Sequence, residues 1–201
     1  MRPRCAMLHL SHHTARDWGR AAVFHIDTIL LDHAHLERKA AGTAMMILFK
    51  YSHLAVLAEP LSELAREELA HFELVLSHLR QRGLTYKILR AAPYAGQLRE
   101  LSRKKDPEQL LDLMLCSALI EARSCERMQL LAEALSDPPL KDLYAGLLKA
   151  EARHHRLYVE LAELVFPRAQ VAERLAELAE GEGRIVAEAP TLPRLHNNAP
   201  T

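Results

Sequence analysis

Apolar residues recur every three to four positions along most of this chain, which is the spacing of an amphipathic helix. Residues that start or stop helices bound the pattern: Gly83 follows its second long stretch, and Asp106-Pro107 opens the third, with Asp as cap and Pro in the first turn. We predict long helices over residues 27–51, 61–82, 107–135 and 140–165. Shorter helices are expected after Asp17 and over 171–180. No segment alternates as a strand does, so the predicted fold class is all-α.

The connections between the long helices favour one kind of bundle. Ser136-Asp-Pro-Pro139 forms a short turn, whereas the segment from Gly83 to Pro107 exceeds the roughly two to eight residues that are usual between bundle helices. A four-helix bundle with one long crossover, between helices two and three, has ferritin-like connectivity. We predict three parts: a flexible N-terminus (1–16), the ferritin-like bundle (17–166), and a short helix with a disordered tail (167–201).

Length and composition agree with a single helical domain. Of the 201 residues, 49% are hydrophobic, and the formal net charge is zero, so a polyanionic partner must be met by a local patch. The three cysteines, Cys5, Cys116 and Cys125, form no Cys-x-x-Cys pair and are interpreted as buried residues in a reducing compartment. Apolar runs are too short to span a bilayer and no signal peptide is evident. We expect a cytoplasmic protein with no membrane partner.

Two predicted helices carry the pattern Glu-x-x-His, which places a carboxylate and an imidazole on one helical face. These pairs are Glu68-Leu-Ala-His71 and Glu151-Ala-Arg-His154. One such pair alone is most often a solvated one, because Glu and His are common helix residues. The preceding helices add Glu37, 31 residues before Glu68, and Glu121, 30 residues before Glu151. The two halves of the chain therefore repeat one pattern.

Carboxylates on two antiparallel helices face each other when the turn lies midway between them in sequence. The midpoint of the second glutamate pair is Ser136, within the predicted turn, and the midpoint of the first falls at Ser52-His53, where the helical pattern fades. Both pairs are therefore expected to meet. A turn at Ser52 leaves Pro60 inside the early part of the second helix as a kink, whereas a turn at Pro60 would shift the level of Glu68.

A two-iron centre is the simplest use of these side chains. The predicted metal ligands are Glu37, Glu68, His71, Glu121, Glu151 and His154. Four buried carboxylates would repel one another unless cations lay among them, and two divalent ions balance their charge. Carboxylates and imidazoles without a thiolate suit iron or manganese, and six ligands leave positions open for O2. The alternative is that these residues are surface salt bridges and satisfied histidines.

Basic residues concentrate between the second and third long helices. Residues 80–105 contain only one acidic residue, Glu100. They contain eight basic residues: Arg80, Arg82, Lys87, Arg90, Arg99, Arg103, Lys104 and Lys105. Such a run is often ordinary solvated surface, but in a neutral protein it also fits a contact with RNA. Other charged or ionisable side chains, namely His9, His12, His13 and Glu126, are interpreted as solvated or as part of an outer face.

Longer strings surround the proposed ligands. They are Leu31-Asp-His with Glu37-Arg-Lys-Ala-Ala, Leu64-Ala-Arg-Glu-Glu-Leu-Ala-His71, Ile120-Glu-Ala-Arg-Ser-Cys-Glu-Arg127 and Leu148-Lys-Ala-Glu-Ala-Arg-His154. Over roughly 17–166 the chain resembles the tRNA hydroxylase family often called MiaE, and Glu-Ala-Arg-Ser-Cys-Glu-Arg is the most specific string. The resemblance implies an enzyme that hydroxylates the isopentenyl group of 2-methylthio-N6-isopentenyl adenosine next to the anticodon, using O2, to give the ribosyl-zeatin form. It also implies the tRNA anticodon arm as partner.

Two other classes of function are weighed against this one. A ferritin- or rubrerythrin-like protein would oxidise iron or detoxify peroxide, and a helical interaction protein would bind no metal. For the monooxygenase we expect an external electron donor, either a separate reductase or a ferredoxin-type protein. The sequence has no Gly-x-Gly-x-x-Gly turn for a nicotinamide or flavin and no cysteine set for an iron–sulfur cluster.

Overall fold

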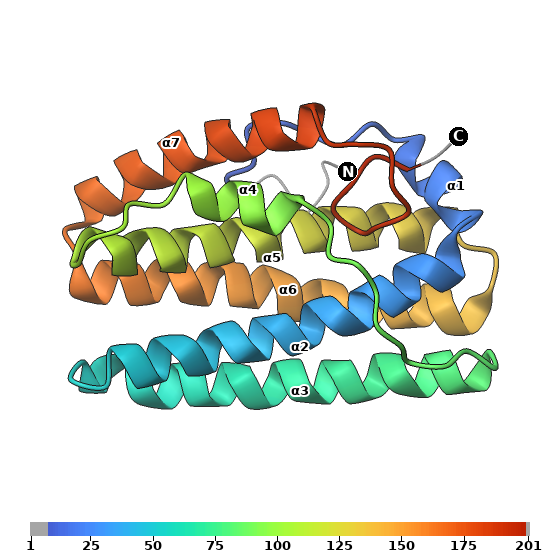
Figure 1. Ribbon diagram of the computed structural model, residues 1–201, viewed down its shortest axis with the longest axis horizontal. Coiled ribbons are helices and arrows are strands. Elements are labelled where there is room, and N and C mark those ends of the chain that lie inside the picture. The colour runs from blue at the N-terminus through green and yellow to red at the C-terminus, as the bar shows by residue number, and fades with distance from the viewer. Residues whose placement is uncertain (1–7, 200–201) are drawn as a thin grey trace. The chain divides into compact units, whose positions relative to one another are not determined.

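The computed structural model describes residues 8–199, and within this part of the chain the regular structure is helical apart from one isolated bridge between Thr191 and Asn198. The all-α prediction is confirmed. The described residues form two compact units, 8–24 with 92–199, and His25–Ala91. Figure 1 labels their helices, and each unit is described separately below. No helix among residues 8–199 has the length and apolar character needed to cross a membrane.

The unit His25–Ala91 is a pair of long helices packed side by side (Figure 1), α2 (Ile26–Lys50) and α3 (Ala58–Gln81). A turn and the short 3-10 helix Ala55–Leu57 join them, so the connection begins where the sequence midpoint predicted. Pro60 is the third residue of α3, in the turn whose N–H groups have no partner inside a helix, so the kink expected there does not arise.

The C-terminus of α3 has a left-handed residue after it. Gly83 adopts φ 70°, a conformation that costs glycine little because it lacks a Cβ atom. The N–H of Leu84 reaches back to the carbonyl of Leu79 at 2.9 Å, which satisfies one of the last helical carbonyls. The predicted stop at Gly83 is therefore confirmed.

The second unit is built on α5 (Glu108–Ala134) and α6 (Pro138–Val165), which share the largest helix contact within it. Asp137 caps α6 by accepting from the N–H of Leu140 at 3.4 Å. The cap expected at Asp106 is wrong: Pro107 occupies the cap position of α5, with no side-chain cap. The shorter helices of this unit are α1 (Trp18–Val23), α4 (Tyr94–Glu100) and α7 (Arg168–Ala187). The long connection predicted between the second and third long helices is present, between α3 and α5, and contains α4.

The predicted disordered tail is wrong for the described residues. The helix expected over 171–180 runs to Ala187, because Gly181 and Gly183 serve as close-packing positions rather than helix breakers. A Cβ atom on Gly183 would lie 2.5 Å from Oγ of Ser11, and one on Gly181 would lie 2.4 Å from the Leu101 side chain. Beyond the helix, Leu195, His196 and Asn197 are buried.

The predicted flexible N-terminus is likewise wrong for residues 8–16, because buried arginines of α5 hold this segment. Arg123 donates to the carbonyl of His12 at 2.8 Å, and Arg127 donates to Oγ1 of Thr14 at 2.7 Å. Cys116 and Cys125 are buried free thiols, as expected, while Cys5 lies outside the described residues.

Candidate metal centre

Each unit contains half of the predicted ligand set at the middle of its two long helices. In the α2–α3 unit, Glu37 lies on α2 and the Glu68/His71 pair lies on α3. In the other unit, Glu121 lies on α5 and the Glu151/His154 pair lies on α6. Within each unit, therefore, one helix supplies a carboxylate and its neighbour supplies Glu-x-x-His, as the repeat predicted.

The half-site of α2 and α3 brings His71 close to both of its glutamates. Nδ1 of His71 lies 3.6 Å from Oε2 of Glu37 and 3.7 Å from Oε2 of Glu68. Both glutamates are buried, at 4% and 1% exposure. The predicted meeting of Glu37 with the Glu-x-x-His pair is thus found in this unit.

The half-site of α5 and α6 is more tightly enclosed. Glu121, Glu151 and His154 are all buried, and each offers a ligand atom within 4.8 Å of the other two. Two carboxylate oxygens and one imidazole nitrogen at this separation are a donor set that fits iron or manganese. The residues present therefore fit the implied metal.

The charges of the α2–α3 half-site also favour a cation. Burial alone would lower the pKa of His71, but the carboxylates of Glu37 and Glu68 outweigh it and raise that pKa to about 10. Burial would raise the pKa of Glu37, yet His33 and His71 hold it well below its usual range. In the metal-free chain an imidazolium therefore compensates carboxylates that a divalent ion would neutralise instead.

His33 is a member of this half-site that the sequence reasoning missed. It is fully buried, and its Nε2 lies 2.5 Å from Oε1 of Glu37, one turn away on the same helix. The i, i+4 spacing of a histidine and a proposed glutamate ligand was the signal that could have identified it. His35, nearby, binds the connection after α3 instead, through the Tyr86 hydroxyl at 3.0 Å and the Lys87 carbonyl at 2.9 Å.

The predicted RNA-binding residues are divided between the two units. Most are exposed, namely Arg80, Arg82, Lys87, Arg90, Arg99, Lys104 and Lys105. Arg82 pairs with Asp27 at 2.8 Å. Arg103 pairs with the fully buried Asp112 at 2.7 Å and donates its backbone N–H to the same carboxylate, which is the arrangement of a structural ion pair. Arg103 is therefore better explained by stability than by RNA contact.

Glu126 is not on an outer face as predicted. It is buried and accepts hydrogen bonds from Thr14 Oγ1 at 2.6 Å and from Arg123, whose other nitrogens reach Glu182 at 2.8 Å. The Glu-Ala-Arg-Ser-Cys-Glu-Arg string thus combines one proposed ligand, Glu121, with three charged residues of a buried network that ties α5 to the N-terminal segment and to α7.

Comparison with known proteins shows the family. A model of the MiaE family, described as tRNA-(MS[2]IO[6]A)-hydroxylase, matches residues 2–197. A Pseudomonas putida protein named tRNA 2-(methylsulfanyl)-N(6)-isopentenyladenosine(37) hydroxylase is 38% identical over 183 residues, which cover 91% of this chain and 89% of the relative. A Salmonella typhimurium protein of the same name is 34% identical over 137 residues, which are 68% of this chain but only 50% of that relative.

A solved structure gives the same fold. The Synechococcus protein titled "Protein 43 with aldehyde deformylating oxygenase activity" superposes with a TM-score of 0.90, covers 94% of this chain and 95% of its own, and is 45% identical. The fold is ferritin-like, as predicted, and the candidate site of carboxylates and histidines fits iron. From the match over residues 2–197 and the similarity to the Pseudomonas relative, we conclude that the chain is an enzyme belonging to the MiaE family of tRNA hydroxylases.

Proposed function

We propose that this protein is a di-iron, O2-dependent tRNA monooxygenase. Its substrate would be 2-methylthio-N6-isopentenyl adenosine next to the anticodon, and its product the ribosyl-zeatin form of that base. The observation that carries the proposal is the buried Glu121, Glu151 and His154 cluster in a chain of the MiaE family. The family match also favours this function over iron storage or peroxide detoxification.

The proposal requires the two half-sites to act as one centre with six ligands: Glu37, Glu68, His71, Glu121, Glu151 and His154. Four glutamates carry four negative charges, and two ferrous ions would neutralise them. The support for this joint site is the repeated spacing along the chain and the occurrence of the same donor types in both units.

The chemistry divides between metal and protein. When bound, iron would supply the reduction of O2 that is needed to insert an oxygen atom into an unactivated C–H bond. The protein would keep water away from this reaction, because Glu121, Glu151 and His154 are buried, and the small buried residues Ala41, Ala44 and Ala118 on the same helices would leave room for metal and O2. His33 would hold Glu37 in one orientation through its hydrogen bond.

The anticodon arm is proposed to meet exposed cations of the segment from Arg80, near the end of α3, to Lys105, before α5. The exposed residues of this set are Arg80, Lys87, Arg90, Arg99, Lys104 and Lys105, together with Arg82, which pairs with an aspartate. Such contacts would orient the tRNA through its phosphates without reading its sequence. A tRNA substrate would also place the enzyme in the cytoplasm.

Electrons are proposed to come from a separate reductase or a ferredoxin-type donor. The sequence offers three cysteines with no clustered spacing and no nucleotide-binding glycine turn. Only one turnover would then be expected from pre-reduced protein.

A second candidate activity is aldehyde deformylation. The 45% identity to the Synechococcus protein, whose title prints that activity, favours testing it. Both reactions would use the same metal cluster, so the substrate distinguishes them rather than the ligands.

Nucleoside mass spectrometry tests the proposal directly. Reduced, iron-loaded protein is incubated with O2 and tRNA from cells that lack the hydroxylase, and in parallel with a long-chain aldehyde. We expect hydroxylated nucleoside from the tRNA, none from a Glu121→Ala variant, and no shortened product from the aldehyde. Conversion of the aldehyde with no change to the tRNA would replace the proposed function by the second candidate.

A further inference from the structure

A surface groove lies along α6, on a side of the helix other than that of the proposed metal ligands. It has a volume of about 550 Å³. Residues of the N-terminal segment and of α6 line it: Leu8, His9, Lys149, Ala152, Arg153, His155, Arg156 and Val159. The lining includes three cations and no carboxylate.

The three cations have a regular arrangement. Lys149, Arg153 and Arg156 are exposed and follow one another at i, i+4 and i+7, so they share one face of α6. Arg156 also approaches Glu160 at 3.4 Å, but both side chains are largely solvated, and such a pair contributes little and exchanges readily. This face therefore presents a row of positive charge suited to successive phosphates.

The inner wall of the groove is apolar and aromatic. Leu8 is buried, and the imidazole of His9 lies against that of His155, with 5.4 Å between ring centroids and 3.1 Å between Nδ1 and Nε2. His155 is itself fixed, because its Nδ1 lies 2.8 Å from the carbonyl of Ala118 on α5. A flat ligand would thus meet an anchored pair of rings.

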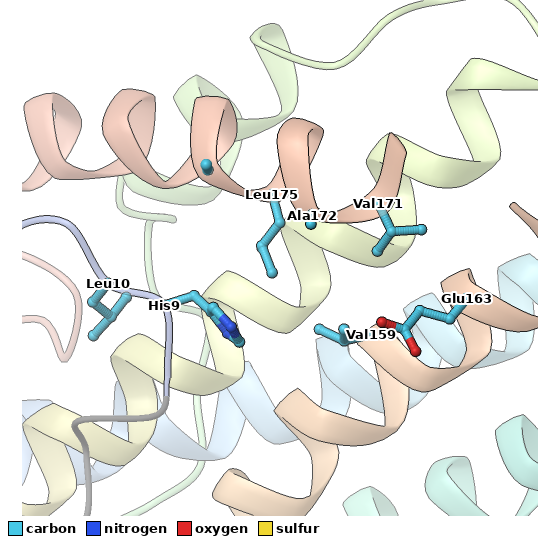
Figure 2. A pocket seen from close by; sticks show the side chains of 8 residues that line it. His9, Leu10, Val159, Glu163, Val171, Ala172 and Leu175 are labelled. Carbon is cyan, nitrogen blue, oxygen red and sulfur yellow. The ribbon is translucent and has the colours of Figure 1, made fainter. Parts of the chain in front are cut away.

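His9 has an unusual backbone. It is the one non-glycine residue among 8–199 with a positive φ, 55°, a conformation that few residues adopt without a local reason. Figure 2 shows the His9 ring reaching from the N-terminal segment toward α6. The same residue lines a second pocket of about 320 Å³, whose apolar wall includes Val159 of α6 and Leu175 of α7. His9 therefore lines both pockets.

We infer that this groove is a nucleotide-binding site that receives an unpaired nucleotide of the RNA substrate, with its phosphates at Lys149, Arg153 and Arg156 and its base against His9. The inference rests on the proposed tRNA substrate. Bases stack on flat side chains irrespective of sequence, and cations track the backbone, which is how single strands are commonly bound. The groove lies on the same turns of α6 as Glu151 and His154. RNA bound there would therefore contact the helix that carries these two proposed metal ligands.

A charge-reversal experiment tests the phosphate contacts. The triple variant K149E/R153E/R156E is compared with R20E/K141E/R168E, which makes the same charge change at three exposed residues outside the groove. The affinity of each for tRNA from hydroxylase-deficient cells is measured over a range of salt concentrations. We expect the groove variant to bind tRNA at least about tenfold more weakly than the control. The slope of log affinity against log salt concentration should also be shallower by about 2, which corresponds to the loss of roughly three single-strand phosphate contacts.

A second variant tests the stacking. His9→Asn retains a residue that tolerates positive φ but removes the ring, and His53→Asn is the control at an exposed histidine of the other unit. Binding of an isolated anticodon stem-loop should weaken about tenfold for the first variant and stay unchanged for the second.

The outcomes separate this inference from the proposed function. If wild-type protein shows no salt-dependent tRNA binding, the proposed function fails. If wild type binds tRNA and the groove triple matches the control triple, the groove inference alone is wrong. A groove triple that binds tRNA normally but loses donor-dependent turnover would also overturn it, because the face would then dock an acidic protein donor. Should charge reversal disturb folding, K149Q/R153Q/R156Q must still weaken binding relative to R20Q/K141Q/R168Q.

Discussion

His33 holds the carboxylate of Glu37 through a buried hydrogen bond of 2.5 Å. A side chain that orients a metal ligand typically changes metal affinity by ten- to a hundredfold when it is removed. We predict that His33→Ala lowers iron affinity about tenfold, as measured by competition with a chelator. His53→Ala, at an exposed position, should leave the affinity unchanged. Equal affinities for the two variants would mean that Glu37 needs no such support.

Asp112 is fully buried between Arg103 and Arg174, which approach it at 2.7 and 3.0 Å. Burial would raise its pKa, but the two guanidinium groups hold the pKa below its usual value of 3.8. The folded-state pKa is thus lower than the unfolded one. The carboxylate therefore stabilises the fold above pH ~4, and this contribution is lost as the pH falls through the folded-state pKa.

Asp112→Asn should accordingly lower the free energy of unfolding at pH 7 by about 2 kcal/mol, because it removes the buried carboxylate that the partly exposed Arg103 and Arg174 bind. Denaturant unfolding at pH 7 and pH 3 measures this, and the difference from wild type should shrink at the lower pH. The exposed Asp142→Asn is the control. A deficit that is equally large at pH 3 would contradict the titration argument.

The six proposed ligands could be named from sequence because one pattern occurs twice at almost the same spacing. The burial of charged residues such as Glu126 and Asp112 could not be predicted from the sequence. Their partners include Arg174, which is distant in sequence from Asp112, and Thr14, which is distant from Glu126. No helical periodicity links such partners, so a buried carboxylate looks the same as a solvated one until the chain is folded.

At the level of helices, prediction succeeded where local chemistry decides the boundary. Gly83 ends α3, and the turn between α5 and α6 lies at Asp137, because cap geometry is set by a few neighbouring residues. Prediction failed at Asp106, because Pro107 takes the cap position of α5, and it failed for α7 and the segment beyond it. Gly181 and Gly183 signal a loop locally, yet they lie within the helix, where the side chains of Leu101 and Ser11 occupy the space that a Cβ atom would take.

Arg127 joins three segments of the α5–α6 unit. It donates to Thr14 Oγ1 and to the Asn197 carbonyl, each at 2.7 Å, and its guanidinium lies 4.2 Å from the centre of the Trp18 ring. We predict that Arg127→Ala speeds amide hydrogen exchange in residues 8–16 and 188–199, since both lose a buried contact. Exchange within α6 should change far less. The exposed Arg20→Ala is the control, and uniform acceleration throughout the unit would indicate global destabilisation instead.

On the scale of the whole molecule, the proposed tRNA surface can be tested without disturbing the fold. Arg103 is unsuitable, because its change to Glu would place two carboxylates together at Asp112. Arg99, Lys104 and Lys105 are exposed, so the triple change to Glu should weaken tRNA binding and reduce its salt dependence while iron content and helicity persist. Unchanged affinity across salt concentrations would leave this segment as ordinary solvated surface.

The proposed six-ligand centre depends on both units, because ligands from each would hold the same two irons. We predict about two irons per chain in wild type, and a similar, severe loss in Glu68→Ala and in Glu151→Ala, measured after anaerobic reconstitution. The double variant should lose little more than either single variant, since residues that serve one site act non-additively. Glu133→Ala, at an exposed position on α5, is the control. If each single variant instead retained one iron and the double variant none, each unit would bind its own metal independently, and the six-ligand centre would be wrong.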